Sequence, residues 1–159
     1  MEKGLFRQVM GRYATGVTVV TTSLDGKNYG FTVNSFTSVS LHPPLVLICV
    51  NSTSETCRVL QESKHFAVNV LTSNQEDLSN LFANPNIRAG ERFKNIDFST
   101  SSSGSPILPD VLAWIDCSLH EVVDGGDHLI FIGRVTDMAA ETEDSESPLL
   151  YYSGTYKRF

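Results

Sequence analysis

Hydrophobic positions along the chain follow two different spacings. Near the N-terminus they recur at helical intervals, which predicts a short amphipathic helix over residues 4–14, with one apolar face formed by Leu5, Val9, Met10 and Tyr13. From residue 17 onward β-branched residues dominate instead. Residues 17–23 and 29–33 flank Asp25-Gly26, a pair typical of a tight hairpin turn, so this part of the chain predicts a β-hairpin.

The middle of the chain alternates between predicted strands and helices. Residues 45–50 (LVLICV) are apolar at every position, so we expect a strand that is covered on both faces. Residues 66–71 predict another strand. Two serines stand three residues before a glutamate, which is the spacing of a capping box and predicts helices that begin at Ser52 (with Glu55) and at Ser73 (with Glu76).

The last third of the chain predicts strands again. Residues 84–110 carry proline, glycine and a serine-rich stretch, and we expect a long loop there, of a kind that is often functional. Residues 113–123 and 128–136 flank the turn sequence Asp124-Gly125-Gly126-Asp127, which predicts a second hairpin. In its first strand one face carries Ala113, Ile115, Cys117 and Leu119, and the other carries Trp114, Asp116, Ser118 and His120. Because strands outnumber helices and come in hairpins, we expect a mainly β fold, a closed or split antiparallel barrel with peripheral helices.

Composition narrows the classes of protein. A chain of 159 residues with 41% hydrophobic residues fits one globular domain, and we treat residues 1–159 as a single domain. The longest apolar run is far below the ~20 residues of a membrane helix, and we expect neither secretion nor a membrane partner. A net charge of −6 argues against a nucleic-acid partner. The acidic run at 141–146 indicates a solvated loop.

Three cysteines, Cys49, Cys57 and Cys117, form no close pair, which favours reduced thiols in a cytoplasmic protein. The chain has no G-x-G-x-x-G, Walker, G-x-S-x-G or C-x-x-C motif. His120-Glu121 begins a pattern close to H-E-x-x-H, but on a strand such side chains do not converge, so we expect no metal site.

Small polar residues cluster at three chain reversals. The segment 32–38 (TVNSFTS) follows a strand, and its accessible backbone groups suit a flat heteroaromatic ring or, alternatively, a loop that bonds to itself. The segment 51–54 (NSTS) opens a helix and suits either an anion such as a phosphate or simple capping. The third reversal carries Gly126-Asp127-His128, where the histidine is either functional or merely solvated.

Taken in order, five segments resemble the short flavin reductase family, whose fold is the flavin-binding split β-barrel. The resemblance runs from Phe6 to Tyr156 through FRQVMGRYATGVTVVTT (6–22), GFTVNSFTSVSLHPPLVLICV (30–50), FAVNVL (66–71), GDHLIFIGRVTD (126–137) and PLLYYSGTY (148–156). Members of this family are reductase components of two-component flavin-dependent monooxygenases that act on substrates such as phenols. The order and spacing of all five segments make the resemblance specific.

The resemblance implies a set of binding residues. It places Thr32, Val33, Asn34 and Ser35 along the isoalloxazine ring, and it places Val50, Asn51, Ser54 and Thr56 along the ribityl and phosphate path. Phe82 and Arg88 would lie near the phosphate or adenine end of the flavin. His128 and Tyr152 would flank the nicotinamide, with His128 as the catalytic residue that orients it.

The resemblance also implies the reaction and the partners. NADH or NADPH would pass a hydride to FAD or FMN, and the reduced flavin would serve a separate monooxygenase. A homodimer with flavin near the subunit interface is expected. Two alternatives stay open: a split-barrel oxidase of the pyridoxamine-phosphate type, which would need a basic phosphate clamp, and a flavin-binding module without turnover.

Overall fold

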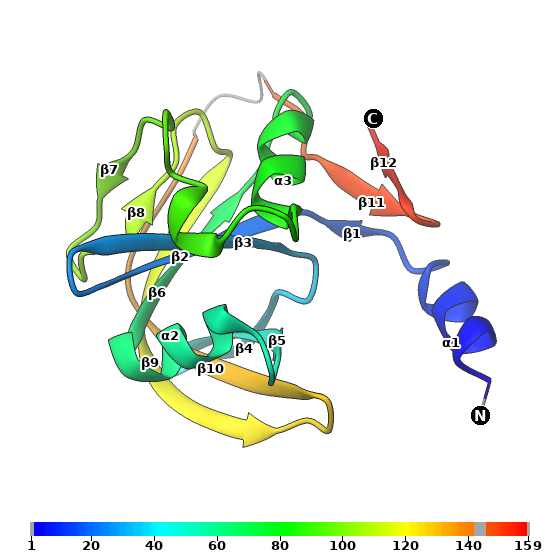
Figure 1. Cartoon of the computed structure of the whole chain (residues 1–159), viewed down its shortest axis with the longest axis horizontal. Helices are drawn as coiled ribbons and strands as arrows, with labels where there is room; N and C mark the ends of the chain where they lie inside the picture. Colours follow the sequence, from blue (N-terminus) through cyan, green and yellow to red (C-terminus); the bar gives the residue numbers. More distant parts are fainter. Residues whose placement is uncertain (1, 142–145, 159) are drawn as a thin grey trace.

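The computed structural model describes residues 2–141 and 146–158, so the middle of the acidic run, residues 142–145, lies outside the described residues. Its main element is a seven-stranded antiparallel sheet in the order β3-β2-β6-β9-β10-β5-β4 (Figure 1). The strands are β2 (Thr18–Leu24), β3 (Lys27–Val33), β4 (Thr37–Leu41), β5 (Pro44–Asn51), β6 (His65–Val70), β9 (Ala113–Asp124) and β10 (His128–Ala140). The expected mainly β fold with few helices is therefore confirmed.

The two edge strands of this sheet are joined directly by the chain. β3 ends at Val33 and β4 begins at Thr37, although the two strands lie at opposite ends of the strand order. A connection this short spans at most about 14 Å. The sheet must therefore curl until its edges nearly meet, which produces a barrel that is split at residues 34–36.

Both predicted hairpins are present. β2 and β3 pair antiparallel across Asp25 and Gly26, whose φ values of 51° and 76° are those of a tight hairpin turn. β9 and β10 pair antiparallel across the second turn, where Gly126 has a φ of 88°. At both turns a glycine adopts a backbone conformation that other residues rarely take.

The strand β5 corrects the expectation that both of its faces are covered. Val46, Ile48 and Val50 are buried, whereas Leu45 and Cys49, on the other face, are only half-buried. The buried face packs against α2 (Glu55–Ser63) and the barrel core. The second face stays partly exposed in the described part of the chain.

The starts of two helices also differ from the expectation. Ser54, not Ser52, caps α2, because its side chain accepts a hydrogen bond from the backbone N–H of Cys57. Helix α3 (Glu76–Ala83) begins after Gln75 without a side-chain cap, so the prediction for Ser73 is wrong as well. Capping-box spacing alone therefore did not identify the capping residue in either helix.

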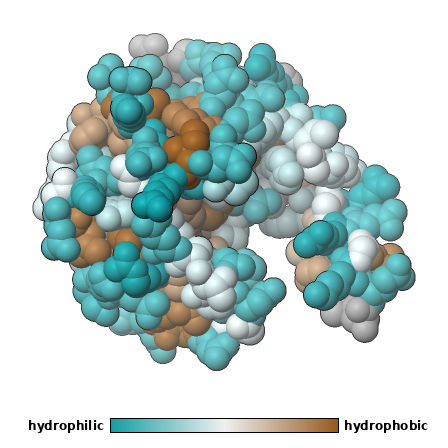
Figure 2. All heavy atoms as spheres, in the orientation of Figure 1, coloured by the Kyte–Doolittle hydropathy of each residue, from teal (hydrophilic) through white to brown (hydrophobic). Residues whose placement is uncertain are grey.

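Helix α1 (Lys3–Met10) confirms the predicted helix but not a packed one. Every residue of α1 is exposed, and its apolar side chains include Leu5 at 55%, Val9 at 59% and Met10 at 51% exposure. Figure 2 shows this N-terminal part as a lobe separated from the barrel by an open cleft. Between the lobe and the barrel the chain forms a small sheet of three strands: β1 (Thr15–Gly16), β11 (Leu150–Tyr152) and β12 (Thr155–Lys157).

The long segment 84–110 contains three short elements: η1 (Ala89–Glu91), β7 (Ser99–Thr100) and β8 (Pro106–Ile107). Ile107 and Leu108 are buried, so this segment is packed onto the barrel. Its first part continues from α3 and lies beside β3 (Figure 1). No helix within residues 2–141 and 146–158 is long and apolar enough to cross a bilayer.

Candidate functional site

Three pockets meet where the barrel is split. Thr32 lines two of them and Asn34 lines two, so the segment between β3 and β4 connects all three. We call them the helix pocket (about 430 Å³), the tyrosine pocket (about 220 Å³) and the cleft pocket (about 740 Å³). The three pockets thus adjoin one another along residues 32–35, which the sequence singled out.

The helix pocket lies between the start of α2 and the segment after α3. Its lining residues are Phe31, Thr32, Ser54, Glu55, Thr56, Phe82, Ala83, Pro85, Ile87, Arg88, Ala89 and Arg92. Arg88 is exposed, and its guanidinium forms no hydrogen bond or ion pair with any described residue. The unpaired N–H groups at the start of α2 and this cation together favour an anion.

Arg92 organises the wall of the helix pocket, and the sequence did not single it out. Its guanidinium donates hydrogen bonds to the carbonyl oxygens of Gly30, Phe82, Asn84 and Ile87 at 2.7–3.1 Å. Burial lowers the pKa of Arg92, but guanidinium groups remain charged in proteins. Arg92 thus joins the end of α3 and residues 84–87 to β3.

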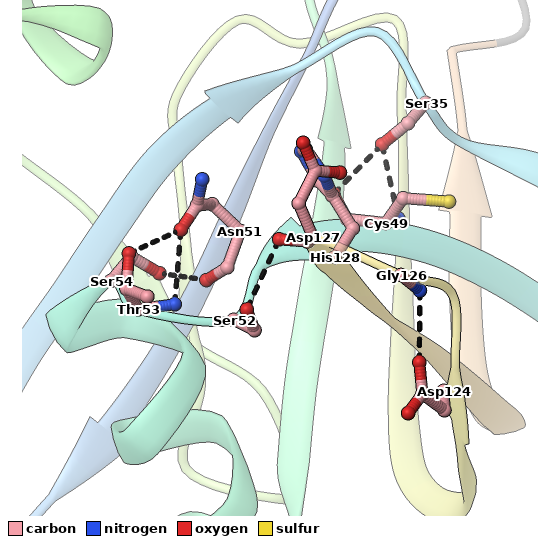
Figure 3. A network of polar contacts seen from close by, with 10 residues as sticks. All are labelled: Ser35, Cys49, Asn51, Ser52, Thr53, Ser54, Asp124, Gly126, Asp127 and His128. Atoms are coloured by element: carbon pink, nitrogen blue, oxygen red, sulfur yellow. Dashed lines mark hydrogen bonds and ion pairs between the residues drawn. The ribbon is translucent and has the colours of Figure 1, made fainter.

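The cleft pocket lies between the N-terminal lobe and the start of β4. Its lining residues are Met10, Tyr13, Ala14, Thr15, Gly16, Thr18, Asn34, Ser35, Phe36, Thr37, Cys49 and Val70. Ser35 Oγ accepts from the backbone N–H of Cys49 at 3.0 Å and donates to its carbonyl oxygen at 3.1 Å (Figure 3). This pair of bonds fixes residues 34–36 to β5 and leaves the exposed side chain of Asn34 at the pocket.

The tyrosine pocket is the smallest of the three. It is lined by Val17, Thr32, Val33, Asn34, Ala83, Tyr151 and Tyr156. The rings of Tyr151 and Tyr156 pack edge to face with centroids 5.5 Å apart. Thr32 Oγ1 donates to the carbonyl oxygen of Ser79 at 2.7 Å, so its side chain is committed to α3 and only its backbone is available to a ligand.

Asn51 and His128 lie side by side, as partners in the ladder between β5 and β10. The backbone N–H and the hydroxyl of Ser52 both donate to the carbonyl oxygen of Asp127 at 3.1 Å, which joins the two loops (Figure 3). Asn51 Oδ1 accepts from the N–H and the hydroxyl of Thr53. The segments 51–54 and 126–128, which the sequence analysis treated separately, therefore form one polar cluster.

His128 is oriented by its neighbour in sequence. Its Nδ1 lies 2.7 Å from Oδ1 of Asp127, and a carboxylate only accepts, so Nδ1 carries the proton. This hydrogen bond, followed by the attraction of the charges, lowers the pKa of Asp127. The other ring nitrogen, Nε2, is left for a ligand.

Three of the predicted residues, Phe82, Val50 and Tyr152, do not offer a free side chain to the pockets. The ring of Phe82 is fully buried and packs against Phe93 with centroids 5.1 Å apart, so it supports a pocket wall and offers no free face. Val50 is a core residue with 4% exposure. Tyr152 lines none of the three pockets; its hydroxyl accepts from Arg12 at 3.3 Å, and this bond lowers the pKa of Tyr152.

The structure thus brings eight predicted residues to the connected pockets: Thr32, Val33, Asn34, Ser35, Ser54, Thr56, Phe82 and Arg88. Asn51 and His128 form the neighbouring cluster. No group of three or more His, Cys, Asp or Glu residues in the described part of the chain could hold a metal ion. A path with a cation at one end and backbone groups along its length suits a long, flat ligand with an anionic tail.

Comparisons with known proteins agree on one family. Residues 10–159 match the family described as flavin reductase like domain. HsaB, the reductase subunit of a flavin-dependent monooxygenase from Rhodococcus jostii, is 45% identical over 151 residues, which cover 95% of this chain and 75% of HsaB. A flavin reductase from Pseudomonas putida is 43% identical over 155 residues, covering 97% of this chain and 88% of that protein.

Solved structures agree with this assignment. The NADH:FAD oxidoreductase SgcE6 from Streptomyces globisporus has a TM-score of 0.90 at 37% identity, with 99% of this chain and 93% of SgcE6 covered. Some curated relatives are longer: one from Rhizobium meliloti is 48% identical over 131 residues, but the chain spans only 41% of its length.

These comparisons confirm the resemblance seen in the sequence. The split-barrel type of fold is confirmed, and so is the expected class of enzyme, an NAD(P)H-dependent flavin reductase. The expected use of flavin with a nicotinamide nucleotide is confirmed at the level of the family. The chain belongs to the flavin reductase like domain family, which includes reductase components of two-component flavin-dependent monooxygenases.

Proposed function

We propose that this protein binds FAD or FMN along the three connected pockets and transfers a hydride to it from NADH or NADPH. The observation that carries the proposal is that Thr32 and Asn34 are shared among three adjoining pockets, one of which is lined by a cation, Arg88. In this arrangement Arg88 and the start of α2 hold the phosphate, and backbone groups of residues 32–35 border the ring. A separate monooxygenase would receive the reduced flavin.

The residues present fit a flavin. Ser54 caps α2, and the exposed guanidinium of Arg88 remains available to an anion. Bound flavin supplies the hydride acceptor, so the protein needs no strong acid or base for the transfer. In this proposal the chain binds and orients both molecules: residues 32–35 border the flavin ring, and His128 orients the nicotinamide.

Oxidation of NADH and NADPH in the presence of FAD, FMN or riboflavin tests this function. We expect nicotinamide oxidation that rises with added flavin, and the preferred pair identifies both substrates. A protein that binds flavin but oxidises neither nucleotide would contradict the proposal and favour an oxidase or a binding module. If the protein neither binds flavin in titration nor oxidises the nucleotides, then the reductase, the oxidase and the flavin-binding module are all excluded.

His128→Ala is expected to slow hydride transfer by about 10- to 100-fold, because the imidazole no longer orients the dihydronicotinamide. Flavin affinity should change by less than about threefold, since His128 lines none of the three pockets. Single-turnover reduction and flavin titration measure the two constants. His120→Ala, at an exposed position of β9, is the matched control. Wild-type values for both constants would show that His128 has no such role.

We also propose that the protein is a homodimer whose subunits pack through α1. An isolated helix of eight residues is not stable in water without packing. Helix α1 nevertheless exposes a row of apolar side chains, and the partly exposed face of β5 is a second apolar surface. A second copy of the chain would bury both.

Val9→Asp should shift the protein from dimer to monomer in sedimentation experiments, because it places a charge in the apolar face of α1. Gln8→Glu, on the polar face of the same helix, should leave the dimer intact. A wild-type protein that sediments as a monomer, or a Val9→Asp dimer of unchanged stability, would exclude this interface.

We place the protein in the cytoplasm and treat its residues as one domain. The supporting observation for the location is that Cys49, Cys57 and Cys117 are all free thiols. Two of them, Cys57 and Cys117, are buried in the barrel core, where burial raises the pKa of both thiols and keeps them unreactive.

A further inference from the structure

Within residues 2–141 and 146–158, one buried side-chain oxygen or nitrogen has no hydrogen-bond partner, and it is the hydroxyl oxygen of Thr15. Thr15 lies in β1, where it pairs with Tyr151 of β11, and it lines the cleft pocket. A hydroxyl that is removed from water without a partner destabilises a protein by about 1–3 kcal/mol. The position of Thr15 therefore needs a physical reason.

The other serine and threonine hydroxyls of the cleft pocket are already bonded within the chain, and Tyr13, whose hydroxyl also belongs to this pocket, is 71% exposed to water. Thr18 Oγ1 donates to the carbonyl oxygen of Val33 at 3.0 Å, and Ser35 is bonded to the backbone of Cys49. Thr37 Oγ1 is oriented toward the carbonyl oxygen of Ser38 at 3.4 Å. Among the described residues of this pocket, Thr15 thus supplies the buried hydroxyl that has no partner.

The shape of threonine adds a second argument. Valine has the same shape as threonine, so it would fill the site equally well without an unsatisfied hydroxyl. When the side chain of Thr15 turns by one staggered rotamer, the hydroxyl takes the place of the methyl group and the methyl group takes the place of the Cβ hydrogen. Such a turn changes which group faces the pocket without moving the backbone of β1.

We propose that Thr15 is a flavin-binding residue whose hydroxyl forms a hydrogen bond with the polar edge of the isoalloxazine ring. This inference rests on the proposed function, which places the ring beside Asn34 and Ser35. Those two residues line the same pocket as Thr15. In the free protein the hydroxyl is unpaired, and binding of the ring satisfies it.

The test compares Thr15→Val, which removes the hydroxyl, with Thr15→Ser, which keeps it. Binding is measured by fluorescence titration with FMN and with lumiflavin, which has the ring but no phosphate. Thr15→Val should weaken both ligands by the same factor, about fivefold to tenfold, because one hydrogen bond to the ring is lost. Thr15→Ser should bind both ligands nearly as wild type.

Arg88→Ala is the matched control for the other end of the ligand. It should weaken FMN but leave lumiflavin unchanged, because lumiflavin has no phosphate to contact. An equal effect of Thr15→Val on both ligands separates a ring contact from a phosphate contact, and wild-type binding by Thr15→Ser separates it from a general loss of the pocket.

Thermal unfolding without flavin gives a readout that does not depend on activity. The melting temperature of Thr15→Val should equal or exceed that of the wild type, because the variant removes an unsatisfied group. Addition of FMN should raise the melting temperature of the variant less than that of the wild type.

Three results would overturn the inference while the function stands. The first is wild-type flavin affinity in Thr15→Val. The second is a lower melting temperature of the free variant with unchanged affinity, which would show that the hydroxyl is paired in the free protein. The third is a rise confined to the KM for NADH, which would assign the hydroxyl to the nicotinamide. If wild-type protein binds neither FMN nor lumiflavin, the proposed function fails together with this inference.

Discussion

Asp116→Ala is expected to lower the free energy of unfolding by about 3 kcal/mol, because it removes the acceptor at the centre of a buried network. The carboxylate is completely buried. Its Oδ1 accepts from the hydroxyl of Ser103 at 2.6 Å, and its Oδ2 accepts from the backbone N–H of Ser103 at 3.0 Å and the hydroxyl of Ser102 at 3.2 Å. Alanine would leave these donors without a partner inside the protein.

The network continues beyond Asp116 and joins three parts of the chain. Ser103 Oγ lies 2.9 Å from Ser105 Oγ, which lies 2.8 Å from Nδ1 of His65 at the start of β6. Because Ser103 donates to the carboxylate, its oxygen is free to accept from Ser105, and Ser105 in turn accepts from His65. Desolvation lowers the pKa of His65, so the ring is neutral at neutral pH. Loss of Asp116 should therefore loosen residues 101–105 as a unit.

Chemical denaturation measures the effect, and a fall of about 6–12 °C in melting temperature should accompany it. Ser102→Ala is the matched control: Ser102 is exposed and makes the longest of the three bonds, so its loss should stay below about 1 kcal/mol. Asp116→Asn keeps one acceptor oxygen, so its loss of free energy of unfolding should lie between those of Asp116→Ala and Ser102→Ala. A loss below about 1 kcal/mol in Asp116→Ala would show that the network does not stabilise the fold.

Most strands and turns were predictable from the sequence because their signals are local. β-branched runs and Asp25-Gly26 define the first hairpin without reference to the rest of the chain. Asp116 shows the limit of such signals. Alternation along β9 assigns it to the polar face of the strand, yet it is buried, because the distant serine segment 101–105 folds over that face. Contacts of this kind depend on tertiary packing, which no local pattern carries.

The residues of the candidate site also fall into two groups: those that a local sequence pattern identifies and those that depend on tertiary contacts. Residues 32–35 were identified because a polar cluster directly follows a strand, and the short connection between edge strands places them at the split of the barrel. Arg92 and Thr15 were not identified. The role of Arg92 depends on four carbonyl oxygens that converge only after folding, and the role of Thr15 depends on the absence of a hydrogen-bond partner. Neither role produces a recognisable spacing of residues in the sequence.

Gly30→Ala is expected to destabilise the protein by about 2–3 kcal/mol, because the new methyl group would overlap a buried ring. A Cβ at Gly30 would meet the ring of Phe82 at Cε1 and, at 2.7 Å, at Cδ1, and it would lie 3.1 Å from Phe93. Phe82 is fully buried and packs edge to face with Phe93, so its ring has no space into which it can move. Gly4→Ala, where a Cβ meets nothing within 4 Å, is the control and should be neutral or slightly stabilising.

A double mutant separates this overlap from a general effect of alanine in a strand. Phe82→Leu alone should be destabilising, because it leaves a cavity, but in Gly30→Ala the smaller side chain relieves the overlap. We therefore expect the double mutant to be more stable in denaturant than Gly30→Ala alone. Additive losses would contradict the proposed contact. Because Arg92 bonds to the carbonyl oxygens of both Gly30 and Phe82, the displaced ring should also move the wall of the helix pocket, so FMN affinity should fall in Gly30→Ala and partly recover in the double mutant.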